Sequence, residues 1–445
     1  MACGEPPAPM AGLSLAAVLR AGIDGSPPSL PKHHWRIINA LLACRTPALG
    51  CHRYRCQECG RTHFVTHSCR NRHCPLCQGR AAREWLARQE AALLPVPYFH
   101  LVFTLPHVLN PLIRQNQRAL YTLLFTAACQ SLLEFGQNRL GVQLGVTAVL
   151  HTWSQTLLDH YHLHCIVTGG GLTADGSQWV HSSPHYLFNV RALSLVFRGK
   201  FCAGLEQLYG QGPLQFHGKL EGLAGSRAFQ RLLRQVARQK WVVYAKRPFA
   251  GPGQVLGYLS RYTHRVAISP GRLRTLDEQN RTLTFAWKDY ADGAKRKIMR
   301  LEVREFVRRF CLHLLPERFV KIRHFGFLSN RQRQTKLAQA RALLVQPNPT
   351  PPPVVLAAIP AAPALRCPYC GSDQLQLLEI VPPQLIVPPR LDSSGTNPLS
   401  HRPPPVKTRP LIAWRHAPAP RVRGRGRTPV WRSVWLAWRA AECHS

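Results

Sequence analysis

The run HYHLHCIVTGGG, residues 160–171, places three histidines at alternate positions with aromatic or apolar residues between them. Successive side chains of a β-strand point to opposite faces, so His160, His162 and His164 would share one face of a sheet. The intervening residues would form the other face and pack against a core. Because imidazole is a common metal ligand, the pattern predicts a strand with one buried apolar face and one metal-binding face.

A second run, VLGYLSRYTHRVAIS at residues 255–269, carries Tyr258 and Tyr262. We interpret it as a helix, in which residues four apart are neighbours, so the two phenol hydroxyls would lie side by side. Arg261 and Arg265 are close to this pair in sequence and are predicted to contact phosphate. A tyrosine pair on an apolar helix is more often core packing. The histidines and the charge of the chain favour a catalytic role here.

A metal ion held by His162 and His164 needs at least one further ligand. Gln155 lies near the expected turn before the histidine strand, and its side-chain carbonyl is an acceptable ligand. His151, in the expected preceding strand, is the alternative if the strand register brings it opposite His164. We favour Gln155. His160 lies one pleat away and is predicted to bind the scissile phosphate or to orient a ligand through a hydrogen bond.

The net charge narrows the class of partner. The 445-residue chain has 58 Lys and Arg against 21 Asp and Glu, a formal net charge of +37. Such an excess attracts polyanions and favours nucleic acid. The segment at 321–336 mixes cations with aromatic rings, which can stack on unpaired bases and so favours single-stranded DNA. No stretch reaches the roughly 18 apolar residues of a membrane span. We expect a cytoplasmic, nucleoid-associated bacterial protein that binds DNA and no membrane.

The 15 cysteines indicate metal binding rather than disulfides in a reducing compartment. Cys56 and Cys59 form one Cys-x-x-Cys pair, and Cys74 and Cys77 form another, with 14 residues between them. We predict that these four thiolates bind one Zn²⁺ ion, which supplies folding energy to a small domain. Five nearby residues are left over: Cys44, Cys51, His67, Cys69 and His73. They would build a second zinc site, or Cys69 and His73 would replace ligands in the first, or some of the cysteines are buried thiols.

Several blocks of the chain resemble the insertion sequence 91 family of rolling-circle transposases, enzymes of the HUH class with two catalytic tyrosines. The resemblance covers about residues 30 to 335, and its blocks are HTWSQTLLDHYHLHCIVTGGG, VVYAKRPFAGPGQVLGYLSRYTHRVAIS, FAWKDYADG and EFVRRFCLHLLPERFVKIRHFGFLSNRQR. It implies that His162 and His164 are the metal pair of the HUH motif and that the ion is Mg²⁺ or Mn²⁺. It also implies that Tyr258 and Tyr262 are the nucleophiles, and that the cysteine-rich domain recognises the ends of the element.

The reaction implied by this resemblance is attack of a tyrosine on a DNA phosphodiester, which leaves a 5′-phosphotyrosyl enzyme and a free 3′-hydroxyl. Since the bond energy is retained, the strand can be rejoined without ATP. The expected partners are the single-stranded element ends and target DNA of rolling-circle transposition, with the oligomeric state open. The alternatives are a rolling-circle replication initiator and a non-catalytic zinc-dependent DNA-binding regulator derived from a transposase.

Composition divides the chain into a leader (1–29), a zinc-binding DNA-recognition domain (30–95), a catalytic domain (96–343) and a Pro-rich basic tail (344–445). Strands are expected at 97–106, 144–153 and 241–246 besides the histidine strand, and helices at 33–44, 81–94, 117–135, 190–208, 227–239 and 304–316. Strands and helices without regular βαβ alternation predict an α+β fold, an HUH-type nuclease domain with an antiparallel sheet and flanking helices. The Pro/Arg-rich tail is expected to be disordered. Cys367 and Cys370 there resemble half a zinc knuckle, with Cys443 and His444 as distant candidates.

Overall fold

A computed structural model describes residues 13–24, 29–90, 92–185, 187–246, 255, 263–344 and 365–383. These residues all belong to one unit of the chain, Met1–Gln384. Tyr258, Arg261 and Tyr262 lie outside the described residues, as does the middle of the helix expected at 255–269. The described end of that run, from 264 to 269, is not helical, so the expected helix does not continue through Arg265. The expected tail lies outside them as well, except for residues 365–383.

The largest sheet of the described residues has six strands with the order β11-β4-β5-β3-β7, in which β6 also pairs with β5. Its strands are β3 (Tyr98–Thr104), β4 (Val142–Trp153), β5 (Asp159–Thr173), β6 (Trp179–His181), β7 (Val242–Lys246) and β11 (Ile322–Gly326). All of these pairings are antiparallel. The expected α+β fold with an antiparallel sheet, and the expected hairpin of β4 and β5, are confirmed.

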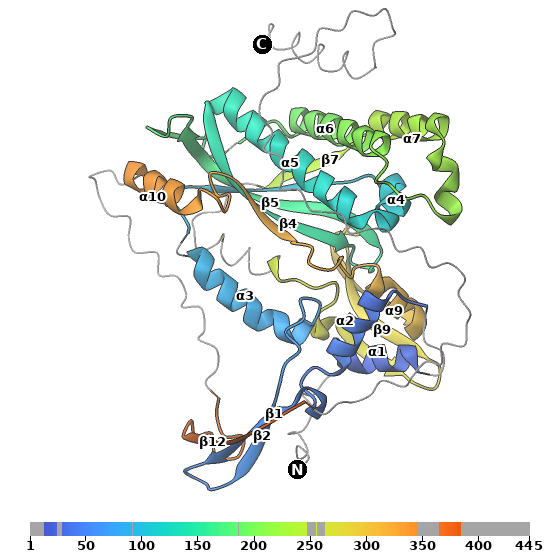
Figure 1. Ribbon diagram of the computed structural model, residues 1–445, viewed down its shortest axis with the longest axis vertical. Helices are drawn as coiled ribbons and strands as arrows, with labels where there is room; N and C mark the ends of the chain where they lie inside the picture. Colours follow the sequence, from blue (N-terminus) through green and yellow to red (C-terminus); the bar gives the residue numbers. More distant parts are fainter. Residues whose placement is uncertain are drawn as a thin grey trace, which may run out of the picture. The chain divides into compact units, whose positions relative to one another are not determined.

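One face of this sheet packs against helices (Figure 1). These helices are α5 (Gln117–Leu140) and α6 (Val190–Gly210), with the short α4 (Asn110–Gln115) before α5, while α7 (Ser226–Arg238) packs against α6. The Tyr161 ring of β5 lies 5.7 Å from that of Tyr121 on α5, and the Phe103 ring of β3 lies 5.0 Å from that of Phe197 on α6. The β5 residues that alternate with the histidines are fully buried, as predicted: Tyr161, Leu163, Cys165 and Val167.

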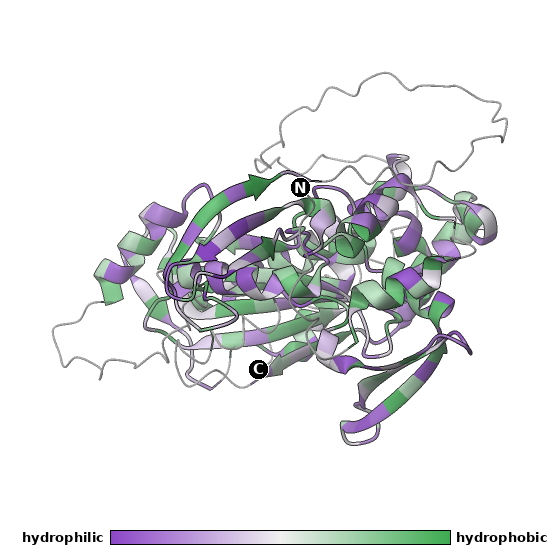
Figure 2. Cartoon of the chain, turned by 90° about the horizontal axis from the view of Figure 1, so that it is seen from below, coloured by the Kyte–Doolittle hydropathy of each residue, from purple (hydrophilic) through white to green (hydrophobic). Residues whose placement is uncertain are grey.

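Strands and helices both carry hydrophobic and hydrophilic residues (Figure 2). Nearly all residues of β4 and β5 are nevertheless buried. Among the described helices, α5 is long and apolar enough to cross a membrane by length and composition. However, 61% of its apolar stretch is buried inside the protein. Its contacts with β4 and β5 account for this composition as that of a core helix.

A second hydrophobic core lies between two helices near the N-terminus, one helix after residue 300 and a small sheet of order β10-β9-β8. Its elements are α1 (Leu15–Ile23), α2 (Lys32–Leu42), β8 (Leu273–Asp277), β9 (Thr282–Asp289), β10 (Lys295–Glu302) and α9 (Val303–Cys311). Leu19, Phe285 and Phe306 are fully buried in it. Residues assigned by sequence to a leader therefore form α1, because Val18 and Leu19 lie on one helix face and pack into this core.

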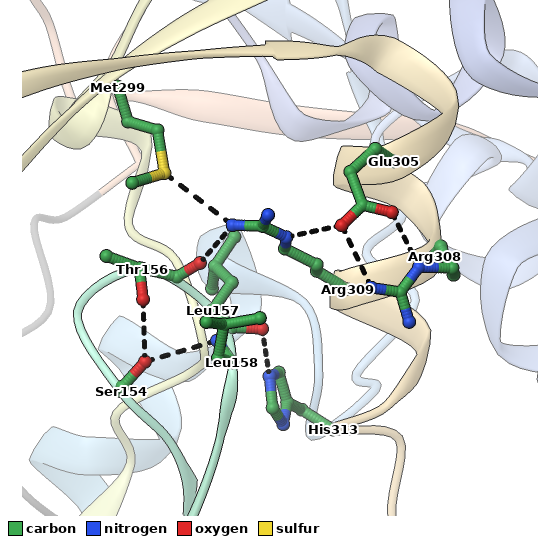
Figure 3. Close-up of polar contacts among 9 residues, drawn as sticks. All are labelled: Ser154, Thr156, Leu157, Leu158, Met299, Glu305, Arg308, Arg309 and His313. Atoms are coloured by element: carbon green, nitrogen blue, oxygen red, sulfur yellow. Dashed lines mark hydrogen bonds and ion pairs between the residues drawn. The ribbon is translucent and has the colours of Figure 1, made fainter.

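The turn between β4 and β5 is held by α9 and the segment after it (Figure 3). The Arg309 guanidinium donates a hydrogen bond to the Thr156 carbonyl oxygen at 3.1 Å, and it also pairs with Glu305. The His313 Nε2–H donates to the Leu157 carbonyl oxygen at 3.0 Å. Leu157 itself is fully buried in the second core. The turn is thus fixed by residues more than 145 positions downstream.

A third sheet, of order β12-β1-β2, lies in the cysteine-rich part of the molecule. It consists of β1 (Cys51–Cys56), β2 (Thr62–Thr66) and β12 (Leu375–Val381). The helix expected at 81–94 is α3, which runs from Pro75 to Glu90. It packs with α10 (Arg333–Leu344) in a cluster that contains Trp85, Ile166 and Leu337. The helix begins earlier than predicted because proline is favoured in the first turn of a helix.

Candidate functional site

Three histidines of the β4–β5 hairpin form a buried group on the sheet face opposite Tyr161. His151 on β4 pairs directly with His162 on β5. His164 pairs with Val149, the preceding β4 residue on the same face as His151. One ring nitrogen from each histidine lies within 4.8 Å of the others. The three residues are 2%, 9% and 8% exposed. The geometry therefore brings three imidazoles to one point that could hold a metal ion.

Hydrogen bonds to Nδ1 orient the two β5 rings. The Nδ1 of His162 is 2.7 Å from the His160 carbonyl oxygen, which can only accept, so Nδ1 carries the proton and Nε2 keeps a lone pair. The Nδ1 of His164 is 2.9 Å from the Nε2 of His100 on β3. If His164 donates in this bond, its Nε2 also has a lone pair for a ligand bond. Such hydrogen bonds commonly fix the tautomer of metal-binding histidines.

The electrostatics of the group keep the two β5 imidazoles neutral. Burial, with smaller contributions from the charges of His160 and then Arg265, lowers the pKa of His162 to about 3. Burial also lowers the pKa of His164 well below its usual range, with contributions from His151 and His162. Neutral imidazole is the form that binds metal. Three imidazoles facing one point, two of them held neutral, fit a divalent ion that keeps open positions for oxygen ligands.

The other predicted site residues of this region lie around the group. Gln155 is in the turn between the two strands, and its backbone carbonyl oxygen accepts a hydrogen bond from the Arg272 guanidinium. The register instead makes His151, the alternative considered from sequence, the third member of the histidine group; Gln155 as a ligand stays a prediction. His160 is half-buried, with its ring 4.8 Å from that of His162 and its Nδ1 3.2 Å from the His107 Nε2.

A cationic cavity lies beside the histidines. Arg265, Lys321 and Trp153 line it, together with Arg72 from the cysteine-rich segment. The Lys321 Nζ donates to the Arg265 carbonyl oxygen at 3.2 Å. Burial, and then the charge of Arg72, lower the pKa of Lys321 to about 8. The charge of Arg265 is also one of those that lower the pKa of His162. The remaining lining is largely apolar, and the cationic side chains would attract an anionic group to its mouth.

Sequence reasoning missed two members of this region. His100 is a single histidine within the apolar run YFHLVFT of β3, and without an alternating pattern it gave no clear signal. The position of Lys321 gave no signal either, because β11 reaches the site through its pairing with β4. Pairing between strands so distant in sequence does not follow from local pattern.

Eight cysteines of the described residues form two groups. One consists of Cys44, Cys69, Cys74 and Cys77, and the other of Cys56, Cys59, Cys367 and Cys370. In the first group, Sγ–Sγ distances are 3.6 Å for Cys44 to Cys77 and for Cys44 to Cys74, and 3.7 Å for Cys69 to Cys77. A tetrahedral ion with Zn–S bonds of about 2.3 Å places its sulfurs about 3.8 Å apart, so this group fits zinc.

The prediction that Cys56, Cys59, Cys74 and Cys77 share one ion is therefore wrong. The reason is the β1–β2 hairpin, which carries Cys56 away from Cys44 and then returns the chain. On its return, the Arg45 amide donates to the His67 carbonyl oxygen at 3.0 Å, and the Cys69 amide lies 3.5 Å from the Cys44 sulfur. The hairpin thus separates the two predicted pairs.

Comparisons with known proteins agree with this geometry. A family model described as "Transposase zinc-binding domain" matches residues 20–105, and one described as "Putative transposase" matches residues 145–336. The putative transposase y4qJ of Sinorhizobium fredii is 44% identical over 362 residues, which cover 79% of this chain and 90% of that protein. The transposase for insertion sequence element IS801 of Pseudomonas savastanoi pv. phaseolicola is 30% identical over 345 residues, 75% of this chain and 81% of that protein.

No solved structure matches the chain significantly. The zinc-binding family model covers Cys44, Cys69, Cys74 and Cys77, so the zinc expected in the N-terminal domain is supported by both sequence family and geometry. Together, the two family matches and the two relatives show a DNA-processing enzyme. The chain belongs to the insertion sequence 91 family of transposases.

Proposed function

We propose that this transposase nicks and rejoins single-stranded DNA at the element ends through a 5′-phosphotyrosine intermediate, in rolling-circle transposition. The observation that carries the proposal is the buried group of His151, His162 and His164 beside the cation Arg265. Tyr258 and Tyr262, the nucleophiles in this proposal, precede Arg265 by seven and three residues in the sequence.

Chain connectivity supports this assignment. Three residues of extended chain span at most about 11 Å, so Tyr262 is tethered within reach of Arg265. Arg265 in turn lies close enough to His162 and His164 to lower the pKa of both. A nucleophile supplied from this segment can therefore meet a phosphate bound beside the histidines.

The chemistry follows from these groups. A divalent ion bound by the histidines, Mg²⁺ or Mn²⁺ in this proposal, would polarise a phosphoryl oxygen and stabilise the charge that develops on it. Arg265 would pair with the same phosphate. The phenol oxygen of Tyr258 or Tyr262 loses its proton and forms a bond to phosphorus, while the bond from phosphorus to the 3′-oxygen breaks and that oxygen takes up a proton. Attack by a 3′-hydroxyl on the phosphotyrosine reverses the step and rejoins a strand.

A single-stranded substrate is favoured by the cavity beside the histidines. Trp153 is partly exposed there, and its ring stacks on His151 at 4.6 Å. Arg72 and Lys321 supply positive charge in the same cavity. An aromatic ring beside cations suits an unpaired base and its phosphate.

The test is incubation of the full chain with Mn²⁺ and labelled single-stranded oligonucleotides from both flanks of the element, followed by denaturing electrophoresis and peptide mapping. We expect a covalent adduct at Tyr258 or Tyr262. An adduct on another residue, or cleavage without an adduct, would contradict the mechanism. A chain that binds these oligonucleotides but never cleaves them would instead support the non-catalytic regulator. Both relatives are named transposases, which disfavours the replication initiator.

A further inference from the structure

Two Cys-x-x-Cys-Gly segments, at residues 56–60 and 367–371, fold into the same turn although they are far apart in the chain. In each, the glycine amide donates to the carbonyl oxygen of the first cysteine at 2.9 Å. The amide of that cysteine donates to the carbonyl oxygen of the residue after the glycine, at 2.9 and 2.7 Å respectively. Gly60 and Gly371 have φ of 70° and 78°, a conformation that favours glycine.

The third Cys-x-x-Cys segment differs. Cys77 is followed by Gln78, and the amides of both donate to the Cys74 carbonyl oxygen, at 3.2 and 3.1 Å, as α3 begins. Residues 74–78 thus form the first turn of a helix and not the turn of the two Cys-x-x-Cys-Gly segments. The matching turns at 56–60 and 367–371 therefore resemble the two halves of one metal site, each with two cysteine ligands.

Strand pairing brings these two turns together. β12 runs antiparallel to β1 from Cys51 opposite Val381 to Cys56 opposite Leu375. The Gln57 amide continues the ladder with a 3.0 Å hydrogen bond to the Gln374 carbonyl oxygen. At the other end, a Cβ atom at Gly50 would lie 2.5 Å from the Val381 carbonyl oxygen, so the close approach of the two strands requires glycine there.

The four sulfurs at the end of this ladder have the spacing of a metal site. The Cys56 and Cys370 sulfurs are 3.5 Å apart, and the Cys59 and Cys367 sulfurs are 3.6 Å apart. All four lie within 4.8 Å of one another. These distances are far beyond a disulfide bond of about 2.05 Å and close to the edge of about 3.8 Å in a tetrahedral zinc–thiolate site. We propose that Cys56, Cys59, Cys367 and Cys370 bind a second structural Zn²⁺ ion.

The sheet that carries these turns has little apolar core to hold it together. On β12, Leu377, Leu378 and Ile380 are all more than 40% exposed. The contacts between the two chain segments are polar and partly exposed, such as the 3.3 Å ion pair between Arg53 and Glu379. Exposed ion pairs contribute little stability. In domains of this kind, metal binding supplies the folding free energy.

The consequence is a zinc-binding domain made from both ends of the described chain. The family model for this domain matches residues 20–105 and does not include Cys367 or Cys370. The second ion would attach residues 365–383 to the β1–β2 hairpin and complete its sheet. The C-terminal segment is then a structural part of the N-terminal domain.

The experiment is zinc analysis of the purified full-length chain under reducing conditions, with His162→Ala and His164→Ala present so that the histidine group does not contribute. We expect two zinc ions per chain. The pair Cys367→Ser and Cys370→Ser should lower the content to one. As a matched control, Cys202→Ser removes a buried thiol outside both groups and should leave two.

An unchanged content of two ions in the Cys367→Ser, Cys370→Ser chain would overturn the proposal. If that chain loses both ions, the truncated chain 1–344, with His162→Ala and His164→Ala also present, decides. Its first cysteine group packs into the second core through Cys44 and Cys74, so it should fold and keep one ion. One ion in the truncated chain supports the second site, and none or two contradicts it. The single change Cys367→His, with Cys370 kept, leaves a three-cysteine, one-histidine ligand set. This variant should therefore still bind the second ion.

Discussion

His100 offers the sharpest test of the histidine site, because it touches one proposed ligand and no proposed reacting atom. Its Nε2 lies 2.9 Å from the Nδ1 of His164, and the two rings stack at 5.2 Å with an interplanar angle of 10°. Burial lowers the pKa of His100 to about 3, so it is neutral and can accept this hydrogen bond. We predict that His100→Phe keeps the stacking and the volume but removes the acceptor.

The size of the effect follows from the tautomer of His164. With the acceptor gone, the Nδ1–H loses this partner inside the protein, which costs about 1–3 kcal/mol. Moving the proton to Nε2 avoids that cost but removes the lone pair that would face the ion. Either route weakens metal binding by about 10- to 100-fold, equivalent to about 1.4–2.7 kcal/mol.

The assay is titration of Mn²⁺ into the full chain, followed both by calorimetry and by the rate of adduct formation with a single-stranded oligonucleotide. His100→Phe should raise the Mn²⁺ Kd and the half-saturating Mn²⁺ concentration together, while the rate at saturating Mn²⁺ falls less. His100→Gln, whose side-chain oxygen can accept from His164, should recover much of the affinity. Equal Kd values for the wild type and His100→Phe would refute the assigned role of this hydrogen bond.

Three further outcomes test the site. His162→Ala or His164→Ala should lower the metal-dependent cleavage rate by about 100-fold or more, with DNA affinity in a binding assay unchanged, because each removes a main support of the charge-stabilising ion; unchanged cleavage by the double variant contradicts the metal site. The pKa of His162 is about 3 in the folded chain and about 6.5 in the unfolded chain. The neutral histidine therefore contributes its full stability above about pH 6.5. As the pH falls from about 6.5 to 3, the free energy of unfolding decreases by about 1.4 kcal/mol per pH unit. In urea unfolding without metal, His162→Phe should therefore lose about 2 kcal/mol less than the wild type between pH 7.5 and 5, and equal losses would refute this. Tyr258→Phe and Tyr262→Phe should each fold and still form some adduct while transposition in cells fails, and the double variant should form none; an adduct that persists in the double variant assigns the nucleophile elsewhere.

The local sequence pattern was sufficient to predict the β4–β5 hairpin and the different character of its two faces. The alternation of His162, Leu163 and His164 has the period of a strand, and the burial of Tyr161 and Leu163 beneath the helical face follows from that period. The apolar runs that became β3 and β4 were equally readable. These features depend on neighbours in the sequence, where side-chain period and strand geometry are directly linked.

Long-range pairing was not readable in the same way. The Cys-x-x-Cys spacing is identical in the segments at 56–59 and 74–77, but one is a turn and the other begins a helix. The residue after the second cysteine, Gly60 in one case and Gln78 in the other, carried the distinction. Glycine also follows Cys370, which pairs that segment with the first across about 300 residues. No local rule fixes a contact across that separation.

The third histidine depends on the register of the hairpin, and the register depends on the second core. A slip of one residue between β4 and β5 would move His151 to the face that packs against the helices. The ladder already has an irregularity between His151 and Trp153, so pairing alone leaves room for such a slip. The hydrogen bonds of Arg309 and His313 to the turn, together with burial of Leu157, hold the turn in one conformation. The histidine group is therefore positioned by α9 and its core as much as by the strands that carry it.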